Sequence, residues 1–199
     1  MIKNATQKFV PISEIRNGIV VLNNGSMRAI LSSSSLNLSL KSADEQTAAI
    51  RGFQTFLNSL DFNIQIFLQS KKLDIRNYLN ILRQREKEVV EDLLKIQIRE
   101  YIDFVQKFTE QQAIMTKSFY IVVPYDVPSV TGFSVGRMSD QEFLKNYNSL
   151  LQRVSIVKST LTSLGLKIEL TQTEDLVQLY YKIFNPNEVD APAFNESEK

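Results

Sequence analysis

Apolar residues recur along this chain with two different periods, which predict both strands and helices. The run GIVVLNNGSMRAILSS, 18–33, places β-rich segments on both sides of an Asn-Gly turn, the strongest hairpin signal in the sequence. We expect a short extended piece at 9–12 before it and an extended continuation, SSSSLNLSLK, after it. The alternating or β-branched runs NIQIFLQ, SFYIVVPYD and LKIELTQ predict three later strands, at 63–69, 118–126 and 166–172.

Helix signals stand between these strands. Two Ser-x-x-Glu capping boxes, Ser42 to Glu45 and Ser139 to Glu142, predict helices over about 43–60 and 139–164. Gly165 follows the second helix as a C-terminal cap. A last helix is expected from Thr173 until Asn185-Pro186 stops it.

One region between Asp74 and about Met115 contains neither proline nor glycine. A continuous helix of this length would reach about 63 Å at 1.5 Å per residue. Its apolar rows are interrupted by RQREKE at 83–88, which offers nothing to bury. The pattern predicts a long helical arm projecting beyond the sheet, bent or unwound near this polar stretch.

The order of elements predicts an α+β fold with a mixed, largely antiparallel sheet, an N-terminal β-hairpin and helices mainly on one face. A doubly wound α/β sheet is the alternative. We expect one domain over 9–186, a flexible N-terminus at 1–8 and a disordered polar tail at 187–199. The segment 126–138, with two glycines and one proline, is expected to be a mobile loop.

Composition excludes many enzymes. The 199 residues include no cysteine and no histidine, which removes Ser-His-Asp and Cys-His catalysis and the usual zinc sites. A Walker A loop is also absent, so we expect no enzymatic activity, cofactor or bound metal. Ser155 and Lys158 match an S-x-x-K pattern only weakly, and an ordinary helix is the favoured interpretation.

Two features supply the residues of a candidate contact surface: a basic corner and a set of aromatic side chains on the predicted arm. QSKKLDIRNYL, 69–79, has the strand-turn-helix setting of an anion site, but without glycine it is better interpreted as a solvated basic corner. Aromatic side chains on a projecting helix must be covered, by a neighbouring helix of the same chain or, as the alternative, by a partner protein. The candidate surface comprises Lys71, Lys72, Arg76, Arg83, Arg85, Tyr101, Phe104 and Phe108.

The ordered segments FVPISEIRNGIVVLNNGSMRAIL, LNLSLKSADEQ, FQTFLNSLDFNIQIFLQSKKLDIRNYL, FYIVVPY and LVQLYYKIFNP resemble the N-terminal domain of TraC-like, conjugative type IV secretion ATPases. The resemblance extends to small stand-alone TraC-like proteins and covers about 9–186. Because no motor motifs are present, it implies a non-enzymatic assembly or docking module and no ATP hydrolysis.

The resemblance also implies partners. We expect protein components of the secretion complex, such as the motor ATPase or inner-membrane subunits, at the cytoplasmic face of the membrane. The longest aliphatic runs are far short of the roughly 20 residues of a spanning helix, so a peripheral location is expected. A homo-oligomer is also compatible with the sequence. Nucleic-acid binding through the five basic candidates is the alternative function, disfavoured by a net charge of only +1.

Overall fold

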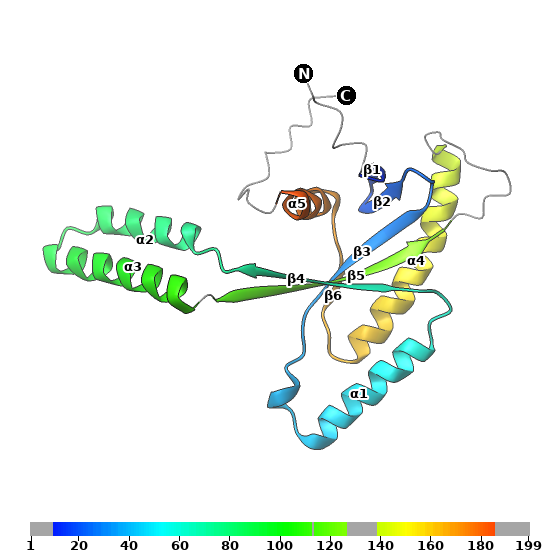
Figure 1. Ribbon diagram of the computed structural model, residues 1–199, viewed down its shortest axis with the longest axis horizontal. Coiled ribbons are helices and arrows are strands. Elements are labelled where there is room, and N and C mark those ends of the chain that lie inside the picture. Colours follow the sequence, from blue (N-terminus) through cyan, green and yellow to red (C-terminus); the bar gives the residue numbers. More distant parts are fainter. Residues whose placement is uncertain (1–9, 113, 127–138, 186–199) are drawn as a thin grey trace. The chain divides into compact units, whose positions relative to one another are not determined.

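The computed structural model describes residues 10–112, 114–126 and 139–185 (Figure 1). The expectations of a flexible N-terminus, of a mobile loop beyond residue 126 and of a disordered tail lie outside these residues. The chain divides into two compact units, one made of residues 1–67 and 119–199 and the other of residues 68–118. Each unit is described by itself below.

Six strands form one antiparallel sheet. Five of them follow the order β1-β2-β3-β5-β4, and β6 pairs with β3. The strands are β1 (Ile12–Arg16), β2 (Ile19–Leu22), β3 (Met27–Ser33), β4 (Gln65–Lys72), β5 (Met115–Tyr125) and β6 (Ile168–Leu170). The α+β prediction is confirmed. The doubly wound alternative is wrong, because β3 pairs antiparallel with β2, β5 and β6.

Two tight turns begin the sheet. Leu22 and Ser26 close the predicted turn around Asn24-Gly25, where Gly25 has a φ of +77°. A second turn, at Asn17-Gly18, joins β1 to β2 with φ values of +51° and +73°. This Asn-Gly pair carries the same sequence signal as the first, and our strand prediction missed it. The first strand spans Ile12–Arg16, whereas a short extended piece at 9–12 was predicted.

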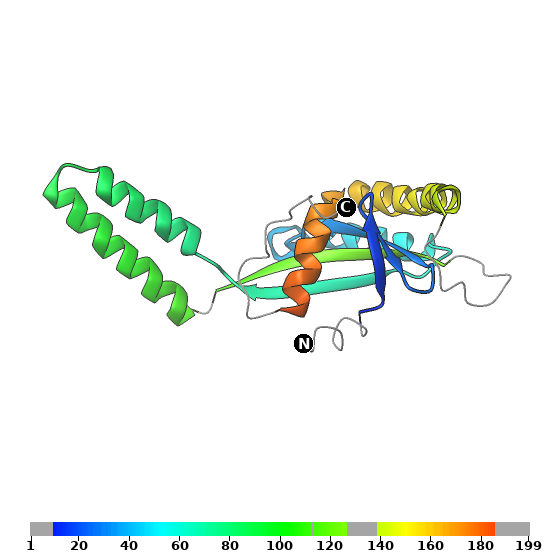
Figure 2. The same ribbon diagram turned by 90° about the horizontal axis from the view of Figure 1, so that it is seen from above.

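Helices cover both faces of this sheet in the first unit (Figure 2). Helices α1 (Ala43–Asn58) and α4 (Asp140–Ser163) pack on the face that carries Ile19, Met27 and Val123. Helix α5 (Thr173–Phe184) packs against Val20 and Ile30 on the opposite face. The prediction of helices mainly on one face thus holds for two of the three helices.

Local signals explain where these helices begin. Both predicted capping boxes are present, at Ser42/Glu45 and at Ser139/Glu142. The backbone of Ser42 donates a hydrogen bond to Glu45, which lowers the pKa of this carboxyl group. Helix α4 ends before Gly165, whose φ of +86° confirms the predicted glycine cap.

The serine-rich segment after β3 differs from the prediction. Instead of an extended run with leucines on one side, Leu38–Leu40 forms a short 3-10 helix, η2. Asn37 caps it by accepting a hydrogen bond from the Ser39 backbone at 3.1 Å. Leu38 and Leu40 are exposed, so no buried face selects an extended conformation here.

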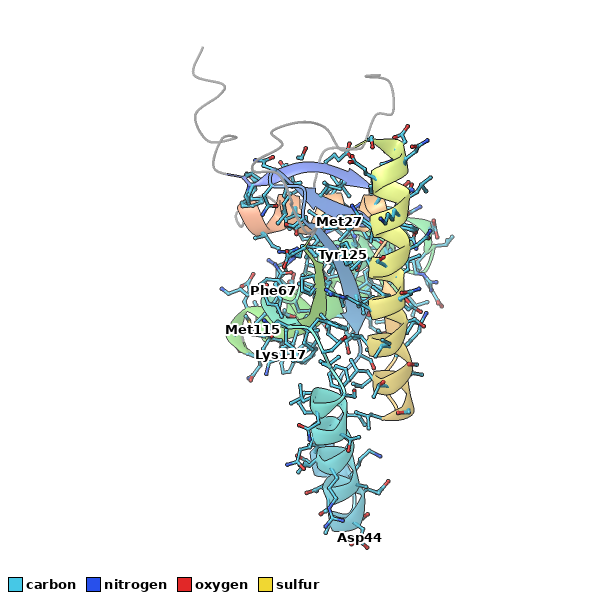
Figure 3. The ribbon with its side chains drawn as sticks, turned by 90° about the vertical axis from the view of Figure 1, so that its right-hand side faces the viewer. Met27, Asp44, Phe67, Met115, Lys117 and Tyr125 are labelled. Atoms are coloured by element: carbon cyan, nitrogen blue, oxygen red, sulfur yellow. The ribbon has the colours of Figure 1, made fainter. Side chains whose placement is uncertain are left out.

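Three of the residues labelled in Figure 3 orient the first unit. Met27 and Tyr125, which are partners across β3 and β5, lie at one end of the central strands beside α4. Asp44 lies in the first turn of α1, away from these strands. Only Phe56 of α1 is fully buried, so the C-terminal half of this helix supplies its contact with the core.

The second unit contains two helices instead of one. Helix α2 (Arg76–Glu88) and helix α3 (Asp92–Gln112) lie side by side as an antiparallel hairpin (Figures 1 and 2). No continuous helix of about 63 Å forms, and the break falls at 89–91, just after the polar stretch where a bend or unwinding was predicted. At the base of the unit, the Leu73 N–H donates a hydrogen bond to the Ile114 carbonyl at 2.8 Å.

Candidate protein-interaction face

The two hairpin helices pack through one row of side chains each. We call this contact the hairpin seam. Its less exposed positions recur every three or four residues: Ile75, Leu79, Leu82, Glu86 and Val89 in and beside α2, and Lys95, Ile98, Ile102, Val105 and Thr109 in α3. This is the spacing of coiled-coil a and d positions, so one narrow stripe per helix holds the hairpin together.

A polar pair closes the tip end of the seam. Leu79 and Ile102 are its two buried residues. Near the tip, Arg99 Nε donates to Glu86 Oε1 at 2.6 Å, and the Glu86 side chain is only 19% exposed. The polar stretch at 83–88, expected to bury nothing, therefore supplies one seam position.

The turn between the helices has a physical cause that glycine and proline do not signal. In one continuous helix, Leu79 and Ile102 would point about 140° apart at 3.6 residues per turn. No single surface could then cover both halves. Val89 adopts an extended conformation and Val90 is 90% exposed, so the chain leaves the helix here and both stripes can meet.

Each helix of the hairpin carries a second row that the other helix does not cover. We call the two rows together the open stripe. It comprises Tyr78, Ile81 and Arg85 on α2, and Leu94, Tyr101, Phe104 and Phe108 on α3, all of them exposed. Leu94, Tyr101 and Phe108 repeat at seven-residue intervals, which keeps them on one side of α3.

Contacts across the helices confirm that both rows lie on the same side of the hairpin. The Tyr78 and Tyr101 hydroxyl groups lie 3.2 Å apart and share a hydrogen bond. This bond raises the pKa of Tyr78, which favours its neutral form. The rings of Phe104 and Phe108 stack with their centroids 5.8 Å apart. The open stripe is thus an ordered aromatic surface.

The predicted aromatic candidates come together, but not as expected. Tyr101, Phe104 and Phe108 share the open stripe, and they remain 45–61% exposed. The expectation that a neighbouring helix of the same chain buries them is wrong, because α2 packs on Ile98, Ile102 and Val105 instead. Helices α2 and α3 therefore hold together without covering these three aromatic side chains.

The predicted basic candidates do not form one cluster. Lys71 and Lys72 are the last two residues of β4, which extends beyond the predicted strand, so the corner before α2 begins only at Leu73. Arg76 binds the Asp74 carboxylate with its backbone N–H and its guanidinium. By helical spacing, Arg83 falls on the opposite side of α2 from Arg85, which alone joins the open stripe.

Three residues of the open stripe were not among the sequence candidates: Tyr78, Ile81 and Leu94. A signal was present, because the α3 row from Leu94 to Phe108 contains two interleaved seven-residue patterns instead of one. Ile98 and Val105 belong to the buried pattern, while Leu94 and Tyr101 belong to the exposed one. The two patterns can be told apart only when the position of the turn between α2 and α3 is known.

The structure gives no support to the other candidate sites considered from the sequence. Ser155 and Lys158 are exposed on α4 beside the half-exposed Ile156. Among the residues that the structure describes, no three acidic side chains are grouped so that they could hold a metal ion. In the same parts of the chain, every helix is too short or too polar to cross a bilayer.

These features define an α+β domain in which a helical hairpin with an exposed aromatic side is inserted between two strands. Residues 13–186 match the model of the archaeal TraC-like domain, and the chain belongs to this family. The match confirms the resemblance drawn from the sequence. No curated protein matches the chain.

Proposed function

We propose that this chain is a non-enzymatic protein-interaction module of a conjugation or type IV secretion apparatus, and that its contact surface is the open stripe. The main support for this proposal is the ordered, exposed aromatic surface in a member of the TraC-like family. Its partners are protein components of that apparatus at the inner face of the membrane.

The chemistry of the open stripe supports a protein partner. Tyrosine, phenylalanine and arginine are the residue types enriched in protein interfaces, and four aromatic side chains lie together here. Contiguous apolar patches beyond a few hundred Å² mark interaction surfaces on soluble proteins.

The charge of the hairpin unit argues against nucleic acid as the partner. Residues 68–118 carry ten Lys/Arg and eight Asp/Glu, which is a net charge of +2. Phosphate binding requires a much stronger positive surface. Arg76 is also engaged with Asp74, and Arg99 with Glu86.

Co-purification tests the proposed role. The chain would be expressed with the motor ATPase and inner-membrane components encoded beside it, captured, and the bound proteins identified. We expect at least one of these components to be retained, and Phe104→Ser to reduce its recovery at least about tenfold. Phe184→Ser is the matched control, because Phe184 is 54% exposed and stacks on Tyr180 in the other unit.

Retention of none of these components, in a preparation where they are present and folded, would refute the role. Equal losses for Phe104→Ser and Phe184→Ser would refute the open stripe as the contact surface. A fluorescence-anisotropy titration with duplex DNA in dilute salt addresses the alternative, and salt-sensitive binding there would favour a nucleic-acid partner.

A further inference from the structure

The open stripe has the geometry of half a four-helix bundle. In such a bundle each helix contacts two neighbours and therefore needs two adjacent apolar rows. Helices α2 and α3 each have two rows, one in the hairpin seam and one in the open stripe. A hairpin that only had to hold itself together would need the first row alone.

We infer that the open stripe binds the open stripe of a second copy of this chain, so that two hairpins form an antiparallel four-helix bundle. This inference rests on the proposed function: a second copy of this chain is the protein component that covers the open stripe, and the other components are retained by the paired hairpins. A second copy supplies the two missing helices, each with the required exposed row. In a two-fold symmetric contact the same patch serves both partners.

The size of the surface fits a small, concentration-dependent dimer interface. The four aromatic residues are 44–61% exposed, which amounts to about 400 Å² when each side chain offers about 200 Å². Ile81 and Leu94 are also exposed and extend this area toward the roughly 800 Å² per partner of a standard interface. The open stripe runs from Leu94 to Phe108 on α3, beside the 13 residues of α2, so the contact would run for about 20 Å.

The charges on this side also fit a second copy. Arg85 lies in the open stripe, and Glu88 follows it by three residues on the same side of α2. A surface that carries both signs meets a copy of itself without net repulsion. Anionic lipid and nucleic acid would instead select a surface of one sign.

The opposite side of α3 provides the internal control. Gln97 falls between Leu94 and Tyr101 in the open stripe, whereas Gln106 points away from it by helical spacing and hydrogen-bonds Glu110 at 3.3 Å. Because the chain has no cysteine, Gln97→Cys and Gln106→Cys each introduce a single thiol. Neither residue contributes to the hairpin seam.

The test uses the full chain. Sedimentation velocity between about 1 and 300 μM should show a monomer–dimer equilibrium, and Phe104→Ser should weaken dimerisation at least about tenfold. The alkylation rate of the Gln97→Cys thiol should fall as protein concentration rises, while that of Gln106→Cys stays constant. Phe108→Ser gives a second variant, and far-UV circular dichroism verifies that the helices persist in each.

Four results would overturn the inference: a monomer over the whole concentration range, a dimer unaffected by both phenylalanine variants, equal protection of the two thiols, or protection of Gln106→Cys alone. A monomer that still retains secretion components through Phe104 would refute the dimer and leave the proposed function standing. A dimer that meets all expectations but retains no such component would refute the proposed function instead.

Discussion

Ile102→Ala should open the helical hairpin without loosening the sheet. Among the residues of this unit that the structure describes, Ile102 is one of two that are buried, and it lies in the seam against α2. The substitution removes three buried carbon atoms, at about 0.8 kcal/mol each. The thin two-helix layer can collapse around the gap, so we expect a loss of about 2–3 kcal/mol, at the lower end of core truncations.

Hydrogen exchange followed by mass spectrometry measures this loss by region. At 1.4 kcal/mol per tenfold change, the opening equilibrium of α2 and α3 should rise about 30- to 140-fold. Amide protection in β2 and β3 should stay unchanged, because the two units have separate buried residues. Ile96→Ala on the same helix is the matched control, since Ile96 is half exposed and its truncation should cost about 0.5 kcal/mol or less.

Two results would refute this reasoning. If Ile96→Ala deprotects the hairpin as strongly as Ile102→Ala, the seam assignment is wrong. If Ile102→Ala deprotects β2 and β3 as much as the hairpin, the unit does not open locally.

Three further outcomes are expected in urea unfolding. Gly18→Ala should lower the free energy of unfolding by about 2 kcal/mol, because φ is +73° and the new Cβ would lie 3.0 Å from the Thr171 carbonyl oxygen. Gly165→Ala should lower it by about half as much, because φ is +86° but no atom lies within 4 Å of the new Cβ. Arg153→Lys should cost about 1–2 kcal/mol, since Arg153 donates to the Pro124 carbonyl at 2.7 Å and stacks on Phe62 and Tyr125; an unchanged unfolding midpoint would contradict this. Burial raises the pKa of Tyr180 in the folded protein, and this effect exceeds the opposite effect of the nearby Arg28. As the pH rises through about 10, Tyr180 therefore ionises in the unfolded chain before it ionises in the folded protein. The stability of the wild-type chain relative to Tyr180→Phe should therefore be constant below about pH 9 and fall above pH 10; a constant difference up to pH 11 would exclude the effect.

Features governed by neighbouring residues were predictable from the sequence. Ser42 and Ser139 each accept a hydrogen bond from the backbone three residues later, and this spacing is visible without any tertiary contact. The same holds for the glycine cap at Gly165 and for the turn at Asn24-Gly25. The α+β class followed from the order of these local signals.

Features governed by tertiary contacts were not predictable. Strand β4 extends to Lys72 because pairing within the sheet, and not composition, determines its end. The fold-back at Val89 depends on the two buried stripes meeting. For the candidate surface, the sequence identified the three aromatic residues of α3 but grouped them with basic residues from several sides of the unit. Only the position of α2 separates the partly buried Ile98 and Val105 from the exposed Tyr101 and Phe108.

The hydrogen bond from Leu73 to Ile114 makes the intervening segment an exchangeable cassette. Both ends of the insertion meet at one pair of backbone groups, so helices of another length can be grafted there without changing the separation of those ends. The residues that hold the first unit together, such as Ile19, Val123 and Val157, lie outside the cassette. The proposed contact surface could therefore be changed by replacing the cassette, while the sequence of the sheet core is retained.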